Sequence, residues 1–351
     1  MTEQRVTAEQ IEDFSARAFC AVDMPPDDAQ IVAAHMAQAD LIGSDSHGIF
    51  RLPHYIARIR GGAINLRPNI HIDRQTAATA VVDGDNAMGH LVMTFAADVA
   101  VEKAAAAGIA WVGTFNSNHA GPAGLYTRMA VAHNMVGLYG AVASGNPSPG
   151  WGGTELLLGT NPVSIAVPSA TGSPIVLDMA TTVAANGKIK LAAQKGESIP
   201  EGWVIGWDGK PITDPRRANE GFLAPVGGAK GYGLAVMLGL LAGSLNGAAM
   251  GRDVVNFNTD HHSPTNTGQF LCMISLAAFG EVAAIESRFD RVANDLRASK
   301  TMPGFDRVRL PGDESFRKEQ ENAAEGITLS EGLIEALNTL ATELEIAPLG
   351  V

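Results

Sequence analysis

Apolar residues recur at helical spacing near the two ends of the chain. Behind a capping-box sequence at Thr7–Gln10, this spacing predicts an amphipathic helix, and Pro25-Pro26 separates it from a second apolar stripe that ends at Gly43. The same pattern predicts helices over residues 94–107, 283–296 and 330–344. The segment between the last two is predicted to be a loop.

The middle of the chain has a different composition and hydrophobic pattern. From about residue 136 to 269, short β-branched runs alternate with Gly- and Pro-rich loops. Strands are predicted at 79–82, 109–114, 138–142, 163–167 and 175–177, and helices at 181–193 and 232–245. These changes divide the chain into three parts, 1–135, 136–280 and 281–351.

Composition narrows the class of protein. The 351 residues are 46% hydrophobic and 18% charged, which predicts a compact protein with sizeable cores. A net charge of -12 argues against nucleic acid or an anionic membrane as a partner. The polar N-terminus and the lack of a long apolar run favour a cytoplasmic protein. Cys20 and Cys272 have no metal-ligand spacing, and both are expected to be buried.

The first candidate site combines a hydroxyl, an imidazole and a guanidinium at Ser46, His47 and Arg51, with Tyr55 close behind. On a helix, His47 and Arg51 would share one face. Arginine can hold a carboxylate with two parallel hydrogen bonds, and histidine exchanges a proton near neutrality. This cluster suits an enzyme of 2-hydroxy or 2-oxo acids, although a helix cap beside an ordinary polar histidine explains it equally well on its own.

Other motifs admit competing interpretations. No strand-linked Gly-x-Gly-x-x-Gly of the Rossmann type is present, and the Gly-rich run around Lys230 could face a phosphate or permit tight helix packing. A metal-dependent hydrolase built on Asp260-His261-His262 is disfavoured, because adjacent histidines diverge and the run is typical of a surface loop. Ser46 lies in no nucleophile elbow, which disfavours a serine hydrolase. A non-catalytic binding protein is a third alternative.

Several longer motifs, taken together, resemble one family. They include Asp45-Ser46-His47-Gly48, Ser117-Asn118-His119, Gly159-Thr160-Asn161-Pro162, Asp178-Met179-Ala180-Thr181-Thr182, Ile199-Pro200-Glu201-Gly202-Trp203, Gly227-Gly228-Ala229-Lys230-Gly231-Tyr232-Gly233 and Leu310-Pro311-Gly312. In this order, over nearly the whole length, the chain resembles the malate/L-lactate dehydrogenase family of the second, non-Rossmann type. That family also includes ureidoglycolate and sulfolactate dehydrogenases and Δ1-piperideine-2-carboxylate reductases.

The resemblance implies an α/β fold with a mixed or antiparallel cofactor-binding sheet and a mostly helical unit built from both chain ends. It assigns residues 1–135 to a helical and α/β unit that binds the substrate and 136–280 to a nicotinamide-binding domain. Residues 281–351 are assigned to a helical segment that returns to the first unit. It further implies NAD or NADP as cofactor, a small carboxylate as substrate and a homodimer. The expected reaction interconverts a 2-hydroxy acid and its 2-oxo acid, with reduction of cyclic imino acids as the alternative.

Roles of individual residues also follow from the resemblance. His119 is the expected acid/base of the dehydrogenase branch, His47 with Ser46 as relay is that of the reductase branch, and Arg51 is expected to hold the carboxylate. No metal is expected. The implied cofactor contacts, which include the local positive charge that an acidic protein needs for an anionic ligand, are Asp45, Gly48, Ser144, Thr160, Asp178, Met179, Ala180, Lys188, Lys230, Arg309 and Gly312.

Three departures from the family pattern bear on substrate choice. The reductase branch has an acidic residue where this chain has Gly187-Lys188-Ile189, which favours the hydroxy acid reaction. Ala120 follows His119 in place of the common Phe, and Gly206 stands near the usual position of an Asp. The shape of the substrate pocket is therefore expected to differ from that of relatives.

Overall fold

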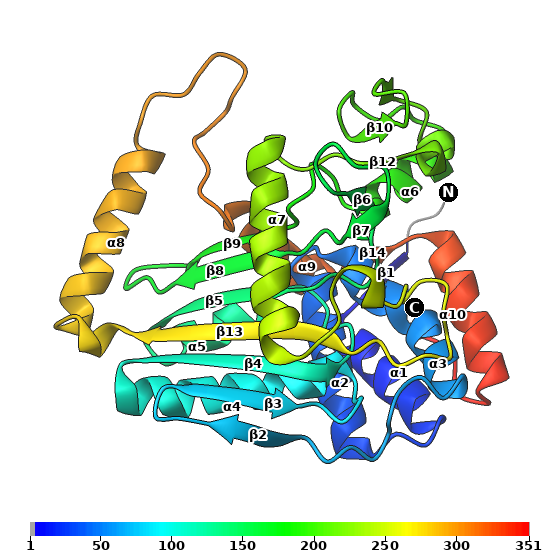
Figure 1. Ribbon diagram of the computed structural model, residues 1–351, viewed down its shortest axis with the longest axis horizontal. Helices are drawn as coiled ribbons and strands as arrows, with labels where there is room; N and C mark the ends of the chain where they lie inside the picture. Colours follow the sequence, from blue (N-terminus) through cyan, green and yellow to red (C-terminus); the bar gives the residue numbers. More distant parts are fainter. Residues whose placement is uncertain (1–3, 351) are drawn as a thin grey trace.

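A seven-stranded sheet runs through the centre of the computed structural model, which describes residues 4–350 (Figure 1). Its strands in spatial order are β2 (His71–Gln75), β3 (Thr79–Asp83), β4 (Ile109–Ser117), β13 (Thr267–Ser275), β5 (Met135–Ala141), β8 (Val163–Val167) and β9 (Ile175–Met179). Only β3 and β4 pair in parallel, and the other neighbours are antiparallel. The expected mixed, largely antiparallel sheet is confirmed. This one sheet contains strands from both sides of residue 135. The predicted domain boundaries at residues 135 and 280 stay a prediction.

Helices cover both faces of this sheet. They are α4 (Gly89–Ala107) and α5 (Gly124–Val131) on one face and α7 (Ala229–Ala242) on the other (Figure 1). From Ala96 onward the buried residues of α4 are all alanine, which lets this part of the helix approach the sheet closely. Gly108 ends α4 in the left-handed conformation at φ 83°, as its position in the sequence predicts, and β4 follows directly.

The two chain ends build one helical unit, as expected. Its members are α1 (Ala8–Cys20), α2 (Pro26–Leu41), α3 (Leu52–Arg60) and α10 (Glu331–Glu343), with a two-stranded sheet of β1 (Gln4–Val6) and β14 (Ile327–Leu329). Side chains from both ends share one apolar core. The capping box is confirmed, because the Thr7 hydroxyl accepts from the Gln10 amide and the Gln10 side chain accepts from the Thr7 amide.

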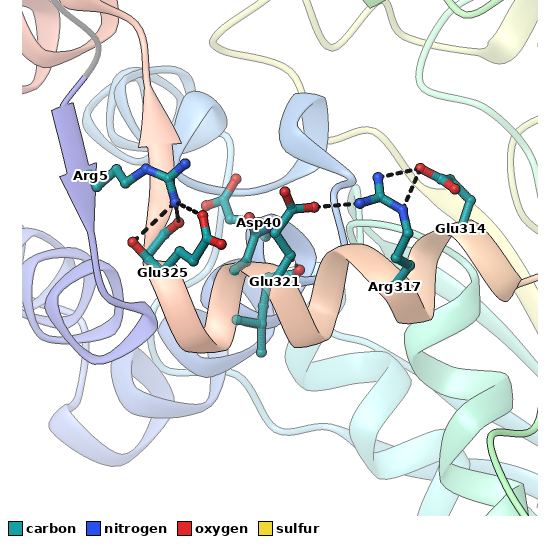
Figure 2. Close-up of polar contacts among 9 residues, drawn as sticks. Arg5, Asp40, Glu314, Arg317, Glu321 and Glu325 are labelled. Atoms are coloured by element: carbon teal, nitrogen blue, oxygen red, sulfur yellow. Dashed lines mark hydrogen bonds and ion pairs between the residues drawn. The ribbon is translucent and has the colours of Figure 1, made fainter.

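A helix that the sequence pattern did not predict, α9 (Asp313–Glu325), is bonded to the end of α2, and Figure 2 shows the ion pairs of Arg317 along it. Arg317 pairs with Glu314 and Glu321, each at 2.6 Å, along its exposed side. The Asn322 amide donates to the carbonyls of Asp40 and Leu41, at 3.2 and 3.0 Å. Charged pairs rather than an apolar stripe stabilise this helix, so hydrophobic periodicity does not reveal it.

A smaller unit follows β9, and one long helix stands at the edge of the molecule. The unit contains α6 (Asn186–Lys195), which starts five residues later than predicted, and the sheet of β10 (Val204–Gly206), β11 (Pro211–Ile212) and β12 (Gly221–Leu223). The two-stranded pair of β6 (Ser148–Pro149) and β7 (Leu156–Leu158) lies nearby, and α8 (Val282–Arg297) stands at the left edge of the view (Figure 1).

Two expectations about individual features have clear outcomes. Cys272 is buried as expected, but the prediction for Cys20 is wrong, because it lies on the exposed side at the end of α1. Within residues 4–350, no helix is both long and apolar enough to cross a membrane.

Candidate active site

The Ser46-His47-Arg51 cluster lies in two consecutive 3-10 turns, Asp45–His47 and Ile49–Arg51, that connect α2 to α3. The prediction that His47 and Arg51 share one helical face is wrong, because the backbone breaks at Gly48. The buried carboxylate of Asp40 accepts a 2.7 Å hydrogen bond from the Ile49 amide. A side chain on Gly48 would begin about 2.0 Å from that carboxylate. Glycine therefore occupies this turn because a side chain would clash with the Asp40 carboxylate.

Arg51 is fixed on one side and open on the other. Its Nε donates to the Ser46 carbonyl at 2.7 Å, and Nη1 donates to Oδ1 of Asn258 at 3.1 Å. Among the residues that the structure describes, Nη2 has no protein partner. The side chain is partly accessible, so this end of the guanidinium can receive an anion.

His119 follows β4 and joins the same cluster. The Tyr55 hydroxyl lies 2.6 Å from His119 Nδ1, and the Gly121 amide nitrogen lies 3.4 Å from the same atom. The His119 ring stacks on the His47 ring, with centroids 5.5 Å apart and planes 18° apart. His47 is arranged in the same way, since the Ser46 hydroxyl lies 3.0 Å from its Nδ1. Each histidine thus has a hydroxyl on Nδ1 and Nε2 left for a ligand.

The surroundings keep both imidazoles neutral. Burial, and next the charge of Arg51, lower the pKa of His47 to about 4. The same two causes hold the pKa of His119 well below the ordinary histidine value. Burial also raises the pKa of the Tyr55 hydroxyl, which stays protonated and can donate to or accept from His119 Nδ1, as the histidine tautomer requires. Both histidines remain partly accessible to solvent, so a small ligand can reach a neutral base.

A loop that sequence reasoning missed forms one wall of the site. Phe257 stacks on His119 with centroids 5.3 Å apart and planes 26° apart, and Asn258 is the partner of Arg51. The Asp260 carboxylate accepts from the amides of His262 and Ser263, each at 2.8 Å, so it caps the loop's own turn. Within residues 4–350, no group of three candidate ligands could hold a metal ion. The sequence offered one signal here, the polar run before β13.

The first turn of α6 faces Ser46. A side chain on Gly187 would begin 3.1 Å from Cβ and 3.6 Å from Oγ of Ser46. The departure noted at Gly187-Lys188-Ile189 therefore lies beside the Ser46-His47 pair, and Lys188 follows with an exposed side chain. An acidic residue at position 187 would lie beside the serine, and this chain has none there.

The predicted cofactor segments converge at the ends of β5, β8 and β9. Asp178 accepts from the Gly124 amide at 2.7 Å; its side chain is reached by solvent, yet the protein packed around it raises its pKa to about 6. Beyond Met179 and Ala180, the amide and hydroxyl of Thr181 both bind the Thr160 carbonyl, at 2.9 and 2.8 Å.

Asn161 joins two of these segments. Its side-chain oxygen accepts from the Ala143 amide at 3.0 Å, next to Ser144, and its Nδ2 donates to the Ala235 carbonyl in α7 at 2.8 Å. Asn161 is fully buried, and its place in the Gly159–Pro162 motif is explained by these two bonds.

The start of α7 suits a bound phosphate group. Gly227 and Gly228 have φ of 61° and 67°, a left-handed conformation that favours glycine, and only Trp151 comes within 4 Å of a side chain built there. The amides of the first turn point out of the helix, and Lys230 adds an exposed positive charge. These donors fit the pyrophosphate of a nicotinamide dinucleotide.

Some predicted residues lie apart from the histidines. The Pro311 carbonyl accepts from the Val176 amide at 3.1 Å, which places the Arg309–Gly312 loop against β9. The Arg309 side chain pairs with Asp306 at 2.9 Å, and Asp45 is exposed. Within the described part of the chain, no direct hydrogen bond joins Arg309 or Lys230 to the histidine cluster.

Comparisons with known proteins agree over the whole chain. Residues 6–338 match the family described as malate/L-lactate dehydrogenase. Malate dehydrogenase of Pyrococcus abyssi is 35% identical, over 99% of this chain and 97% of that protein. L-sulfolactate dehydrogenase of Methanothermobacter thermautotrophicus is 37% identical, over 97% and 98%. The solved sulfolactate dehydrogenase of Methanocaldococcus jannaschii has a TM-score of 0.91 at 33% identity and covers 98% of each chain.

More distant relatives define the range of cofactors and reactions. Ureidoglycolate dehydrogenase (NAD(+)) of Escherichia coli K12 is 30% identical over 95% of each chain. (2R)-3-sulfolactate dehydrogenase (NADP(+)) of Chromohalobacter salexigens is 29% identical over 96% and 98%. The solved Δ1-piperideine-2-carboxylate reductase of Pseudomonas syringae has a TM-score of 0.82 at 29% identity, over 96% of this chain and all of that one.

Proposed function

The chain belongs to the malate/L-lactate dehydrogenase family, and on that premise we propose that it is an NAD(P)-dependent dehydrogenase that interconverts a small 2-hydroxy acid and its 2-oxo acid. One observation supports this most: neutral His119, with the Tyr55 hydroxyl 2.6 Å from Nδ1, shares a cluster with the open end of Arg51. Oxidising a hydroxy acid needs a base, a cation for the carboxylate and a hydride acceptor. When bound, the nicotinamide supplies the last of these.

In this proposal neutral His119 carries its hydrogen on Nδ1, towards the Tyr55 oxygen, so Nε2 takes the hydroxyl proton during oxidation. The imidazolium formed in this way returns the proton to the oxo oxygen during reduction. The open Nη1–Nη2 end of Arg51 holds the substrate carboxylate and orients the carbinol carbon. The cofactor lies along the converging loops and the start of α7. Its proposed contacts are Ser144, Thr160, Asp178, Met179, Ala180, Lys188, Lys230, Arg309 and Gly312, with Asp45 and Gly48 from the substrate side.

A second function has specific support, namely reduction of cyclic imino acids. The structural likeness to a Δ1-piperideine-2-carboxylate reductase and the 3.0 Å contact between Ser46 and His47 favour it. Gly187 and Lys188 disfavour it, because position 187, which lies beside Ser46, carries no carboxylate to complete the relay. We therefore place the hydroxy acid reaction first and His119 ahead of His47.

We also propose a homodimer in the cytoplasm. Leu234, Met237 and Leu240 leave 41–55% of their surface exposed along one side of α7, and Leu245 beyond it is 62% exposed. Contiguous apolar surface of this kind is typical of a subunit interface. NAD(P) is an intracellular cofactor, and the net charge of -12 disfavours nucleic acid as a partner. Light scattering on the purified protein measures the oligomeric state, and a monomer would contradict this part.

The test of function is nicotinamide absorbance with NADH and NADPH, each offered oxaloacetate, pyruvate, sulfopyruvate, 2-oxoglutarate and cyclic imines. Turnover of an oxo acid supports the proposal and identifies the cofactor. Turnover of the cyclic imines alone would assign the protein to the second function and favour His47 over His119. If no combination of cofactor and substrate shows turnover, both proposed functions are rejected.

A further inference from the structure

The loop from Asn256 to Ser263 connects the two halves of the proposed site, and no motif accounts for it. The Phe257 amide donates to the Ser144 carbonyl at 3.0 Å, on the cofactor side. The Phe257 carbonyl is 2.6 Å from His54 Nε2, on the substrate side. Phe257 is 1% exposed, and its ring packs against those of His119 and Tyr55, at centroid distances of 5.3 and 5.8 Å. A shift of this loop would change both sides at once.

Arg58, in α3, anchors this loop from beneath. Its Nη1 donates to the Asp260 carbonyl and its Nη2 to the Ser263 carbonyl, the latter at 2.9 Å. The guanidinium carbon lies 5.0 Å from the centre of the Phe257 ring. Arg58 is fully buried, and none of the described carboxylates pairs with it. Burying a cation costs free energy unless hydrogen bonds compensate for the lost water. Here both terminal nitrogens donate to loop carbonyls.

The attachment extends to the end of α3. A side chain on Gly61 would begin 2.1 Å from the His261 carbonyl oxygen, so the loop backbone lies directly against it. Ring nitrogen Nδ1 of His262 is 3.2 Å from the Gly61 carbonyl. Arg51, Tyr55 and Arg58 are spaced by four and three residues around the start and middle of α3, which brings them to one side of it. One short helix and the residue that caps its start thus supply the carboxylate holder, the partner of His119 and the anchor of the loop.

We propose that Arg58 is a positioning residue for catalysis, which acts through Phe257 and Asn258 on His119 and Arg51. This inference rests on the proposed function for its kinetic consequences, but the order of the loop can be measured without activity. Without the two bonds from Arg58, the carbonyls of Asp260 and Ser263 lose their donors and Phe257 loses its support. Water then reaches His119, which lessens the burial that lowers the pKa of His119.

The main variant is Arg58→Met, which keeps a long apolar side chain and removes both donors. Its matched control is Arg60→Met, on the same helix, where the exposed arginine makes only a 3.3 Å pair with Glu343. For Arg58→Met we expect kcat/KM for the hydroxy acid to fall at least tenfold, and the acid limb of its pH profile, where the base His119 becomes protonated, to move up towards the ordinary histidine pKa. Arg58→Lys should recover little, because one ammonium does not span two carbonyls. Arg60→Met should resemble the wild type.

A double-mutant cycle with Phe257→Ala separates positioning from a general loss of stability. If Arg58 acts through Phe257, the double variant should be no slower than Phe257→Ala alone, within about threefold. The proposal would be overturned if the losses in kcat/KM caused by Arg58→Met and Phe257→Ala multiply in the double variant. A folded Arg58→Met with normal kcat/KM and an unmoved acid limb would also overturn it.

Hydrogen exchange of the Phe257 amide gives the readout that needs no activity. We expect exchange at least tenfold faster in Arg58→Met and unchanged in Arg60→Met. Equal protection in the two variants would overturn the inference. Silence of the wild type with every substrate would reject the proposed function, and the exchange result would still decide whether Arg58 holds the loop.

Discussion

Replacing Tyr55 by Phe tests how the site controls His119. The change removes one hydroxyl and leaves the buried ring, whose centroid lies 5.8 Å from that of Phe257 and 6.5 Å from that of Phe19. Because burial raises the pKa of the hydroxyl, it stays protonated at neutral pH, and its oxygen can accept a hydrogen bond from His119 Nδ1–H. When the Tyr55 oxygen accepts from Nδ1–H, the Nε2 lone pair is left for the substrate hydroxyl proton; in the imidazolium both ring nitrogens carry hydrogen, and Nε2–H is the donor that reduction of an oxo acid needs.

The size of the effect follows from one lost hydrogen bond. Such a bond contributes about 1 kcal/mol, and a buried partner left without it adds a penalty of about 1–3 kcal/mol. The Gly121 amide, at 3.4 Å, is itself a donor and offers no compensation to Nδ1–H. Since about 1.4 kcal/mol corresponds to tenfold in rate, we expect kcat for reduction to fall about 10- to 100-fold. KM should change little, because Arg51 is untouched.

Steady-state kinetics of Tyr55→Phe, with the best oxo acid, is the assay. Tyr126→Phe is the matched control, because it removes another buried hydroxyl with an equally short 2.6 Å bond, to the Ala120 carbonyl. The two variants should lose similar stability in thermal unfolding, and only Tyr55→Phe should lose most of its kcat. The reasoning is refuted if Tyr55→Phe keeps kcat within threefold of the wild type, or if both variants lose it equally.

Three further predictions follow from the same geometry. Arg51→Gln should raise KM for the oxo acid about 100-fold and move the acid limb of kcat/KM for the hydroxy acid upward, since Arg51 helps to lower the pKa of His119; an unmoved limb in a pH series would contradict this. His47 has a folded pKa of about 4, below its unfolded value, so its contribution to stability is present above about pH 6.5 and lost as pH falls towards 4, by at most about 3 kcal/mol; urea unfolding should show a smaller loss in His47→Gln. Gly48→Ala should destabilise the turn by about 1–3 kcal/mol, because its new methyl meets the Asp40 carboxylate; unchanged unfolding would refute the packing argument.

The fold could be predicted where local signals are strong. Gly108 after an alanine-rich run marks the end of α4, and the apolar run behind it marks β4, which places His119 in the loop that follows. The helix α9 has no apolar stripe; Arg317 and its two glutamate partners take that place, so periodicity could not reveal it.

The candidate site could be predicted only in part, because its contacts are long-range. Residue chemistry brought His47 forward and the resemblance gave His119 its role, but Tyr55 and His119 are 64 positions apart and no spacing rule joins them. The break at Gly48 depends on the buried carboxylate of Asp40, which the sequence does not place there. The role of the loop around Asp260-His261-His262 likewise depends on Arg58, some two hundred residues earlier.

The most direct test of the central claim is reduction of an oxo acid by wild-type protein, His119→Gln and His47→Gln, measured as NAD(P)H oxidation under single-turnover conditions. General acid/base catalysis contributes about 100- to 10,000-fold, so the account predicts a loss of that size in His119→Gln and a clearly smaller one in His47→Gln. Near-normal turnover by His119→Gln, or wild-type protein that reduces only cyclic imines, would contradict it.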